Sequence, residues 1–240
     1  MGVSVSCPRC GGPVRPPDLM HTEWRCDNCG PVPPLHVAEH IGADIVASAT
    51  ERVTDAEQGR GPRMPFWCPW PLLAGWTMTG IAWAGDDRTG VRATAVACSG
   101  PVPLGDGPAD LLLVAEEPGL GLGTRLAGIE GPDPGPSLAQ AMGWPDAGRA
   151  GHPPHAKVKA AGHPTPLWMV GSADDHSTYV GEARGSWLYA IGWPADAGYL
   201  LAEDLVLLDL VEWLPPELVF GAPSPRLPGR PDRRGDYPAG

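Results

Sequence analysis

Apolar residues come in short, dense runs that clusters of Pro and Gly separate. Residues 75–85 (GWTMTGIAWAG) and 91–100 (VRATAVACSG) are rich in Thr, Val, Ile and Trp, and the DDRTG between them suits a hairpin turn. Residues 109–117 (ADLLLVAEE) predict a buried strand. Further segments of strand or short-helix length follow at 156–162, 164–170, 186–193 and 199–210. This pattern favours an α+β fold dominated by antiparallel sheet.

A helix is expected earlier in the chain, over residues 37–53, because Ile41, Ile45, Ala49 and Val53 recur every fourth position. His36 and His40 have the same spacing, which fits either a shared ligand or, as we favour, a solvated helix face. The following TDAEQGRGPRM is polar and lacks periodicity, so it predicts a linker. Cys68 lies between two tryptophans and is expected to be buried and unreactive.

Four of the six cysteines form two Cys-x-x-Cys pairs with fifteen residues between them: Cys7, Cys10, Cys26 and Cys29. This interval is at the short end of the range for a four-thiolate zinc site. Two intervening residues allow a tight turn to direct both sulfurs at one point. Gly11 and Gly30, which follow the second cysteine of each pair, suit the positive φ that such a turn needs next. The pattern predicts a zinc ribbon with structural Zn²⁺.

A metal is needed because residues 1–36 are too few to bury a stable apolar core, and a structural zinc contributes about 10–16 kcal/mol. Two disulfides and a rubredoxin-like iron site are weaker alternatives. A catalytic zinc is disfavoured because four protein thiolates leave no open position for water. We expect three apolar side chains to pack around the cysteine turns: Val14, Trp24 and Leu35.

Charge narrows the class of partner. The formal net charge is −11 and the isoelectric point is about 4.9, so a phosphate backbone is repelled on average and nucleic-acid binding is unlikely. The balanced charge of the first 40 residues favours a protein contact or a purely structural role for the ribbon. No secretory signal and no run of 18 apolar residues is present, which predicts a cytoplasmic protein without a membrane segment.

One segment suggests an enzyme. Gly119, Gly121 and Gly123 follow a predicted strand, and this arrangement is similar to the pyrophosphate loop of the acetyltransferase superfamily. In that superfamily, glycine N–H groups and a helix N-terminus hold acyl-CoA. The acidic and proline residues at 116–118 depart from it, and glycines and prolines from Gly128 onward shorten the following helix. A plain glycine-rich loop is therefore favoured over a cofactor site.

Other polar clusters carry weaker hypotheses. If residues 155–163 form a strand, His155, Lys157, Lys159 and His163 share one face and form an anion-binding strip. A charged edge strand, where lysine blocks unwanted pairing, is the favoured interpretation. Acidic pairs occur at Asp86-Asp87, Glu116-Glu117 and Asp174-Asp175, but turn positions account for them equally well. Neither a Gly-x-Ser-x-Gly elbow nor a P-loop occurs in the sequence.

Several long motifs support a family resemblance: PFWCPWPLLAGW, TGIAWAGDDRTGVRATAVACSGP, LLLVAEEPGLGLGTRLAG, GPDPGP, KVKAAGHPTPLW and GEARGSWLYAIGWP. Across most of residues 5–225 the chain resembles a family of uncharacterised bacterial proteins with an N-terminal zinc ribbon, classed as a domain of unknown function. The resemblance implies only that the four ribbon cysteines are metal ligands. It implies no activity.

The predicted organisation is a zinc ribbon (1–36), a helix and linker (37–64), an α+β domain (65–222) and a disordered Pro- and Arg-rich tail (223–240). The leading hypothesis is a zinc protein whose larger domain binds a protein partner or small ligand without catalysis. The alternative is a transferase that uses an acyl-CoA or acyl-phosphate donor at the Gly119–Gly123 loop, with Lys157 and Lys159 on the anion. A deep pocket joining loop and lysines favours the enzyme.

Overall fold

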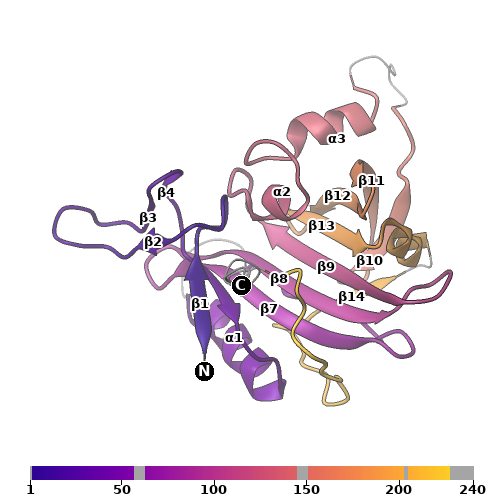
Figure 1. Ribbon diagram of the computed structural model, residues 1–240, viewed down its shortest axis with the longest axis horizontal. Coiled ribbons are helices and arrows are strands. Elements are labelled where there is room, and N and C mark those ends of the chain that lie inside the picture. Colours follow the sequence, from indigo (N-terminus) through magenta and orange to yellow (C-terminus); the bar gives the residue numbers. More distant parts are fainter. Residues whose placement is uncertain (1, 57–62, 145–150, 203–204, 228–240) are drawn as a thin grey trace, which may run out of the picture.

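A computed structural model describes residues 2–56, 63–144, 151–202 and 205–227 (Figure 1). The fold is α+β, as predicted: an eleven-stranded sheet and a separate three-stranded sheet with few helices. In spatial order, the large sheet contains β1 (Val3–Ser6), β5 (Leu35–Ala38), β7 (Thr77–Asp86), β8 (Gly90–Pro101), β9 (Pro108–Glu116), β13 (Ser186–Trp193), β12 (His176–Ala183), β11 (His163–Ala173), β10 (Ala156–Ala160), β14 (Val206–Asp209) and β6 (Trp67–Pro69). Its neighbouring strands are antiparallel except for β10 and β14.

The small sheet projects from one end of the large one (Figure 1). It consists of β2 (Val14–Arg15), β3 (Arg25–Cys26) and β4 (Gly30–Pro31), and the chain builds it between β1 and β5. Because β1 and β5 pair with each other in the large sheet, both ends of the small sheet's segment lie at that sheet's border. The predicted domain limits at residues 36 and 64 stay predictions.

The predicted hairpin is confirmed as β7 and β8, and a short turn joins them. The Asp86 carboxylate shapes this turn, because its Oδ1 accepts the backbone N–H groups of Arg88 (3.0 Å) and Thr89 (2.8 Å). Such an aspartate turn satisfies backbone donors that the strand ladder leaves unpaired.

Both faces of the large sheet are covered. Along β7, Ile81 and Trp83 lie in one apolar core, while Ala82 and Ala84 lie in the other, because side chains alternate along a strand. Helix α1 (Ala43–Ala56) packs on the first core. The 3₁₀ helix η1 (Ala195–Ala202) also contributes to the first core. The second core is covered by α2 (Leu122–Leu126) and α3 (Gly135–Ala141). Coverage on both sides explains why these strands are apolar along their length.

The predicted helix over residues 37–53 starts too early. Residues 35–38 form β5 and pair with β7, so the helix begins only at Ala43. Its predicted stripe holds from there, since Ala49 and Val53 are fully buried. His36 lies on β5 rather than on a helix and bonds through Nε2 to the Gly85 carbonyl oxygen (3.1 Å), so the favoured expectation that His36 and His40 share a solvated helix face is wrong.

The last described segment, which ends at Leu227, lies against the large sheet (Figure 1). Phe220 forms a parallel bridge with Met78, and Leu227 is buried over Gly80, where a Cβ would meet its Cδ1 at 2.4 Å. The structure thus describes residues 223–227, the first part of the segment that was predicted to be a disordered tail. Residues 228–240 lie outside the described part of the chain. None of the described helices is both long and apolar enough to span a bilayer.

Candidate metal centre

The four ribbon cysteines converge on one point. Their sulfur atoms all lie within 4.8 Å of one another, and the Sγ atoms of Cys10 and Cys26 are 3.5 Å apart. A tetrahedral zinc site with Zn–S bonds of about 2.3 Å has sulfur–sulfur edges of about 3.8 Å. All six cysteines are free thiols, so the disulfide alternative is not formed. The donor set and its dimensions fit a single metal ion.

Backbone turns position these thiols. After Cys7 the chain folds back so that the Gly11 N–H donates to the Cys7 carbonyl (2.9 Å) and the Cys7 N–H donates to that of Gly12 (2.8 Å). Gly11 and Gly30 adopt φ of 72° and 75°, which confirms the predicted left-handed turns. Cys26 is aligned by the small sheet, in which β3 pairs with both β2 and β4.

The thiols differ in their ease of ionisation. Burial raises the pKa of Cys7 to about 12. Burial also opposes ionisation of Cys26, but the N–H groups of Asn28 and Cys29 and the neighbouring thiols outweigh it and lower the pKa to about 7. Metal binding requires thiolates, so a bound cation displaces these protons and its affinity rises with pH.

Packing around the centre differs partly from the prediction. Val14 contacts the buried Cys7 and Cys26, as expected, and Val32 completes this small core. The prediction that Leu35 packs around the cysteine turns is wrong, because Leu35 belongs to β5 and is fully buried in the core of the large sheet. Trp24 lines a cavity between the ribbon and the β7–β8 hairpin instead. Val32 sits in a Pro-Val-Pro stretch without periodicity, so the sequence carried no signal for it.

The ribbon is docked on the large sheet from two sides. Within the first cysteine pair, Arg9 donates from Nε to the Leu120 carbonyl (3.0 Å) and from Nη2 to that of Gly119 (3.0 Å). In return, Arg125 of α2 donates from Nε to the Pro8 carbonyl (2.6 Å). On the other side, an Arg88 side-chain N–H from the β7–β8 turn donates to the Thr22 carbonyl oxygen.

The Gly119–Gly123 loop forms one of these docking surfaces. A carboxylate oxygen of Glu116, at the end of β9, accepts the N–H groups of Leu122 (2.8 Å) and Gly123 (3.1 Å). The side chain is fully buried, and burial raises its pKa to about 7. Two N–H groups at the start of α2 are thus already paired with the protein's own carboxyl group. The helix has only five residues and little dipole.

The loop glycines have internal structural roles. Gly121 adopts φ of 91°, and a Cβ there would lie 3.1 Å from Cγ of Arg9. A Cβ on Gly123 would lie 2.3 Å from the ring of Tyr189, which is fully buried, so the ring would have to shift. Close packing beneath the docked ribbon therefore accounts for glycine at both positions.

The remaining polar clusters do not join this centre. Lys157 and Lys159 are exposed on one face of β10, but that strand pairs with both β11 and β14, so the expected edge strand is wrong. His155 Nδ1 accepts the Met169 N–H (3.2 Å). A metal ion needs three or more Cys, His, Asp or Glu side chains close together. Within the described residues, the four ribbon cysteines are the one group that meets this condition. The acidic pairs do not converge.

Two cavities separate the ribbon from the β7–β8 hairpin. The larger has a volume of about 310 Å³ and is lined by Pro17, Trp24, His36, Arg52, Trp83, Gly85, Asp86, Asp87, Arg88 and Val91. The smaller, of about 180 Å³, adjoins it around Trp24 and Arg88. Neither of these two cavities is lined by the Gly119–Gly123 loop or by the two lysines.

The arrangement defines a class of protein: a four-cysteine ribbon that could hold one metal ion, docked on the large, mainly antiparallel sheet of an α+β fold. The chain belongs to a "Family of unknown function (DUF6758)", whose family model matches residues 1–227. No curated protein matches the chain. No solved structure matches it either.

Proposed function

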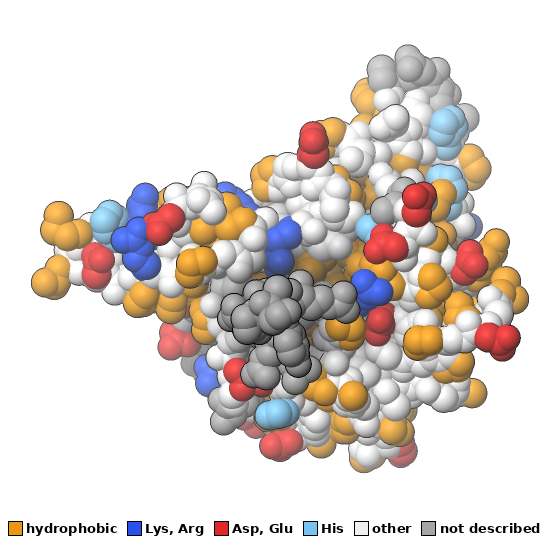
Figure 2. All heavy atoms as spheres, viewed as in Figure 1, with side chains coloured by type: hydrophobic (Ala, Val, Ile, Leu, Met, Phe, Trp, Pro, Cys, Tyr) orange, Lys and Arg blue, Asp and Glu red, His pale blue; other side chains and the backbone are white. Residues whose placement is uncertain are grey.

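We propose that the chain is a zinc-organised, non-catalytic protein-binding module and that the outer end of the ribbon contacts the partner. The loop of residues 16–24, between β2 and β3, carries the observation that supports this. Leu19 and Met20 at its tip have relative exposures of 105% and 85%. Figure 2 shows hydrophobic side chains at the outer end of the projecting ribbon. Adjacent exposed apolar side chains on a projecting loop are typical of interaction sites.

The tip loop is held in one conformation. The Asp18 carboxylate accepts the N–H groups of Met20 and His21, both at 2.8 Å, and the Asp18 N–H donates to the His21 carbonyl (2.8 Å). A loop ordered before binding loses less conformational entropy when it docks. This order supports a role in recognition rather than a loop left exposed by chance.

Zinc is the favoured metal, and a rubredoxin-like iron is the alternative, because both bind four thiolates in a tetrahedron. Four thiolates leave no position for water, so the ion is structural rather than catalytic. Its contribution is to keep the ribbon folded. Reduced thiols fit a reducing, cytoplasmic compartment. The acidic net charge disfavours nucleic acid as a partner. The exposed apolar tip of the ribbon instead suits a protein with an apolar recess.

Site-specific photocrosslinking tests the tip. A photoreactive residue at position 19 is expected to form defined adducts with a protein in the native cell. The control is position 104, where Leu104 is also exposed (62%) but lies in the turn between β8 and β9. The adducts at position 19 are expected to disappear in Cys26→Ser. Equal adducts at both positions, or adducts that survive loss of the ribbon metal, would contradict the proposal.

A small ligand is a second candidate, and the 310 Å³ cavity supports it. Trp83 stacks on His36 (5.3 Å between ring centroids), Arg52 lies 5.9 Å from the Trp83 ring, and Trp24 and Asp87 line the opening. Aromatic faces with both charge signs suit a small planar ligand. Quenching of tryptophan fluorescence by such a ligand, reduced in Trp83→Phe, would support this site.

Transfer from an acyl-CoA or acyl-phosphate donor is the less favoured activity. Glu116 already occupies N–H groups of the Gly119–Gly123 loop, and Arg9 occupies two of its carbonyls. We therefore expect CoA esters to leave the thermal unfolding temperature unchanged. An upward shift that Gly121→Asp abolishes would restore the transferase hypothesis.

A further inference from the structure

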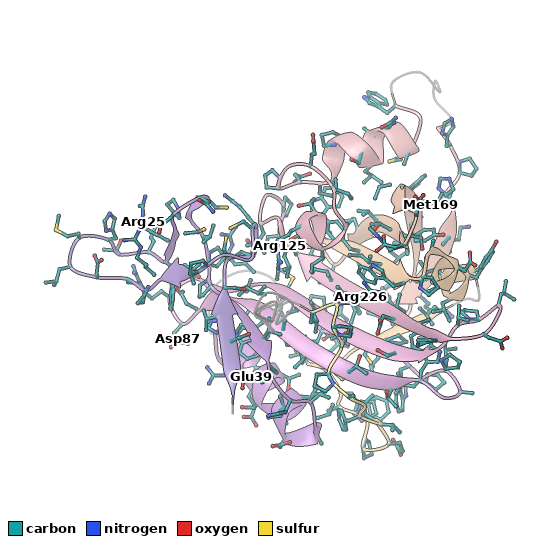
Figure 3. All side chains as sticks on the ribbon, viewed as in Figure 1. Arg25, Glu39, Asp87, Arg125, Met169 and Arg226 are labelled. Carbon is teal, nitrogen blue, oxygen red and sulfur yellow. The ribbon has the colours of Figure 1, made fainter. Side chains whose placement is uncertain are left out.

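Arg125 connects the large sheet to the metal centre. It lies in the last turn of α2, and Figure 3 shows it at the junction with the ribbon. Its Nε donates a hydrogen bond of 2.6 Å to the carbonyl oxygen of Pro8, the residue that follows Cys7. A Cβ on Gly11 would lie 3.3 Å from its Nη1. The guanidinium group thus lies against the turn that presents Cys7 and Cys10.

One nitrogen of this guanidinium group has no partner. Nη2 is buried and makes no hydrogen bond to any group in residues 2–56, 63–144, 151–202 and 205–227. A buried charged donor without an acceptor is costly and is rare in folded proteins. Its other two nitrogens face the first cysteine turn, so an acceptor is expected in the same direction.

Charge identifies that acceptor. Four thiolates around one divalent cation carry a net charge of −2 in a partly buried site, and a nearby cation reduces the cost of burying it. Burial lowers the pKa of Arg125, whereas the Cys7 and Cys10 sulfurs act in the opposite direction and favour its charged form. Metal-bound sulfur also accepts hydrogen bonds, which withdraw charge from it and tune the metal centre.

We propose that Arg125 is a positioning residue of the metal centre, whose Nη2 donates to the metal-bound thiolate of Cys7 or Cys10. The contact holds the thiolate in place and shields it from protons and competing metal-binding agents. Since Arg125 belongs to α2, it also links metal retention to docking of the ribbon on the large sheet. The inference rests on the zinc binding proposed above and goes beyond it by assigning a residue outside the ribbon to the centre.

Zinc transfer to a chromogenic chelator tests this in the full-length chain. Arg125→Met is expected to release zinc roughly 10-fold or more faster than the wild type, as loss of comparable outer contacts does at other sites. Arg125→Lys keeps the positive charge but lacks the several N–H donors of the guanidinium group. Its rate of zinc release is expected to lie between those of the wild type and Arg125→Met. In the Co²⁺-loaded protein, the sulfur-to-metal charge-transfer band is expected to shift in both variants.

Two arginine variants serve as controls. Arg9→Met removes the docking contacts to the carbonyls of Gly119 and Leu120, in the loop before α2, without removing a donor from the thiolates. Arg92→Gln removes a half-buried arginine that pairs with Glu117 (2.6 Å) outside the ribbon. Both are expected to keep the wild-type cobalt spectrum. Release from Arg9→Met as fast as from Arg125→Met would assign the effect to docking alone and overturn the proposal.

These measurements distinguish a failure of the proposed zinc binding from a failure of the Arg125 contact alone. Zinc analysis of the wild type comes first, and a chain without zinc overturns the proposed function and this inference together. If zinc is present, wild-type release rates and an unshifted cobalt band in Arg125→Met overturn the Arg125 contact alone. If Arg125→Met does not fold, as circular dichroism would show, the same two measurements on Arg125→Lys decide: an unshifted band and an unchanged rate overturn it.

Discussion

Glu116 accepts the backbone N–H of Gly123 at 3.1 Å, seven residues along the chain, through a carboxylate oxygen that is fully buried. The same oxygen accepts the N–H of Leu122. A strand end and the start of α2 are thereby fixed together, and the loop between them presents its carbonyl groups to the ribbon. One carboxyl group thus supports both the packing of the large sheet and the surface on which the ribbon sits.

This carboxyl group is expected to make stability depend on pH. Burial raises its folded-state pKa from 4.5 to about 7. Below pH 4.5 the group is protonated in both states and contributes no difference. Between 4.5 and 7 the unfolded chain loses its proton first, so the free energy of unfolding falls as pH rises, by about 3 kcal/mol in all.

Glu116→Gln isolates this effect. Urea unfolding of both proteins at pH 5 and pH 8 is expected to show that the wild type loses stability relative to the variant as pH rises. The metal centre is common to both, so its own pH dependence cancels in the difference. Parallel pH profiles would show that Glu116 does not titrate in this range.

Gly123→Ala is expected to destabilise the protein by about 1–3 kcal/mol, because the added Cβ would overlap the Tyr189 ring, its nearest atom 2.3 Å away. Gly171→Ala is the matched control: its Cβ would meet Ile129 at an ordinary 4.0 Å, so we expect a change within about 0.5 kcal/mol. Chemical denaturation measures both. Equal effects would mean that the close approach of the loop to Tyr189 is relaxed in solution.

Asp209→Ala is expected to cost about 3–5 kcal/mol. Its side chain is fully buried, contacts Arg63 (3.3 Å) and Arg184 (3.0 Å), and accepts the Phe66 N–H. Removal leaves these charges and donors unpaired. Glu212→Ala, which removes a 46% exposed carboxylate from the same two arginines, is expected to cost less than about 1 kcal/mol. Thermal unfolding measures both variants. Similar losses of stability in the two would show that burial does not decide how much each carboxylate contributes.

Cys26→Ser is expected to abolish stoichiometric zinc binding, because the remaining three thiolates no longer close a tetrahedral site. Elemental analysis and proteolysis of the ribbon measure the loss. Cys98→Ser provides the control, since this thiol is buried in the large sheet's core and lies outside the centre. It is expected to lower stability but to retain one zinc per chain. Full zinc retention in Cys26→Ser would contradict the assigned ligand set.

Local features were predictable from the sequence. The convergence of the four cysteines follows from two short turns, and Gly11 and Gly30 adopt the positive φ that those turns require. The β7–β8 hairpin follows from alternating β-formers around one turn. The confirmed burial of Cys68 also needed only its neighbours in sequence. In each of these, the residues that determine the structure lie close together in the chain.

Long-range pairing was not predictable in the same way. Residues 37–53 were predicted as a helix from the spacing of Ile41 to Val53, yet residues 35–38 pair with the edge of β7 as β5. The contacts of Arg9 and Arg125 join residues more than one hundred positions apart, and periodicity holds no information on them. A basic residue enclosed within Cys7-Pro8-Arg9-Cys10 was the available signal, since its side chain must point away from the metal.

The pairing of Ser6 with Leu35 in adjacent strands means that the chain leaves the large sheet and returns to it at almost the same place. The residues between Ser6 and Leu35 therefore form an insertion whose two ends are held together by this strand pairing. If the metal is lost, the insertion becomes a loop whose ends are still held, and the entropy it gains is that of a tethered segment alone. We therefore expect loss of the metal to unfold this insertion locally and reversibly, and we expect the same scaffold to accept a foreign hairpin grafted at this position.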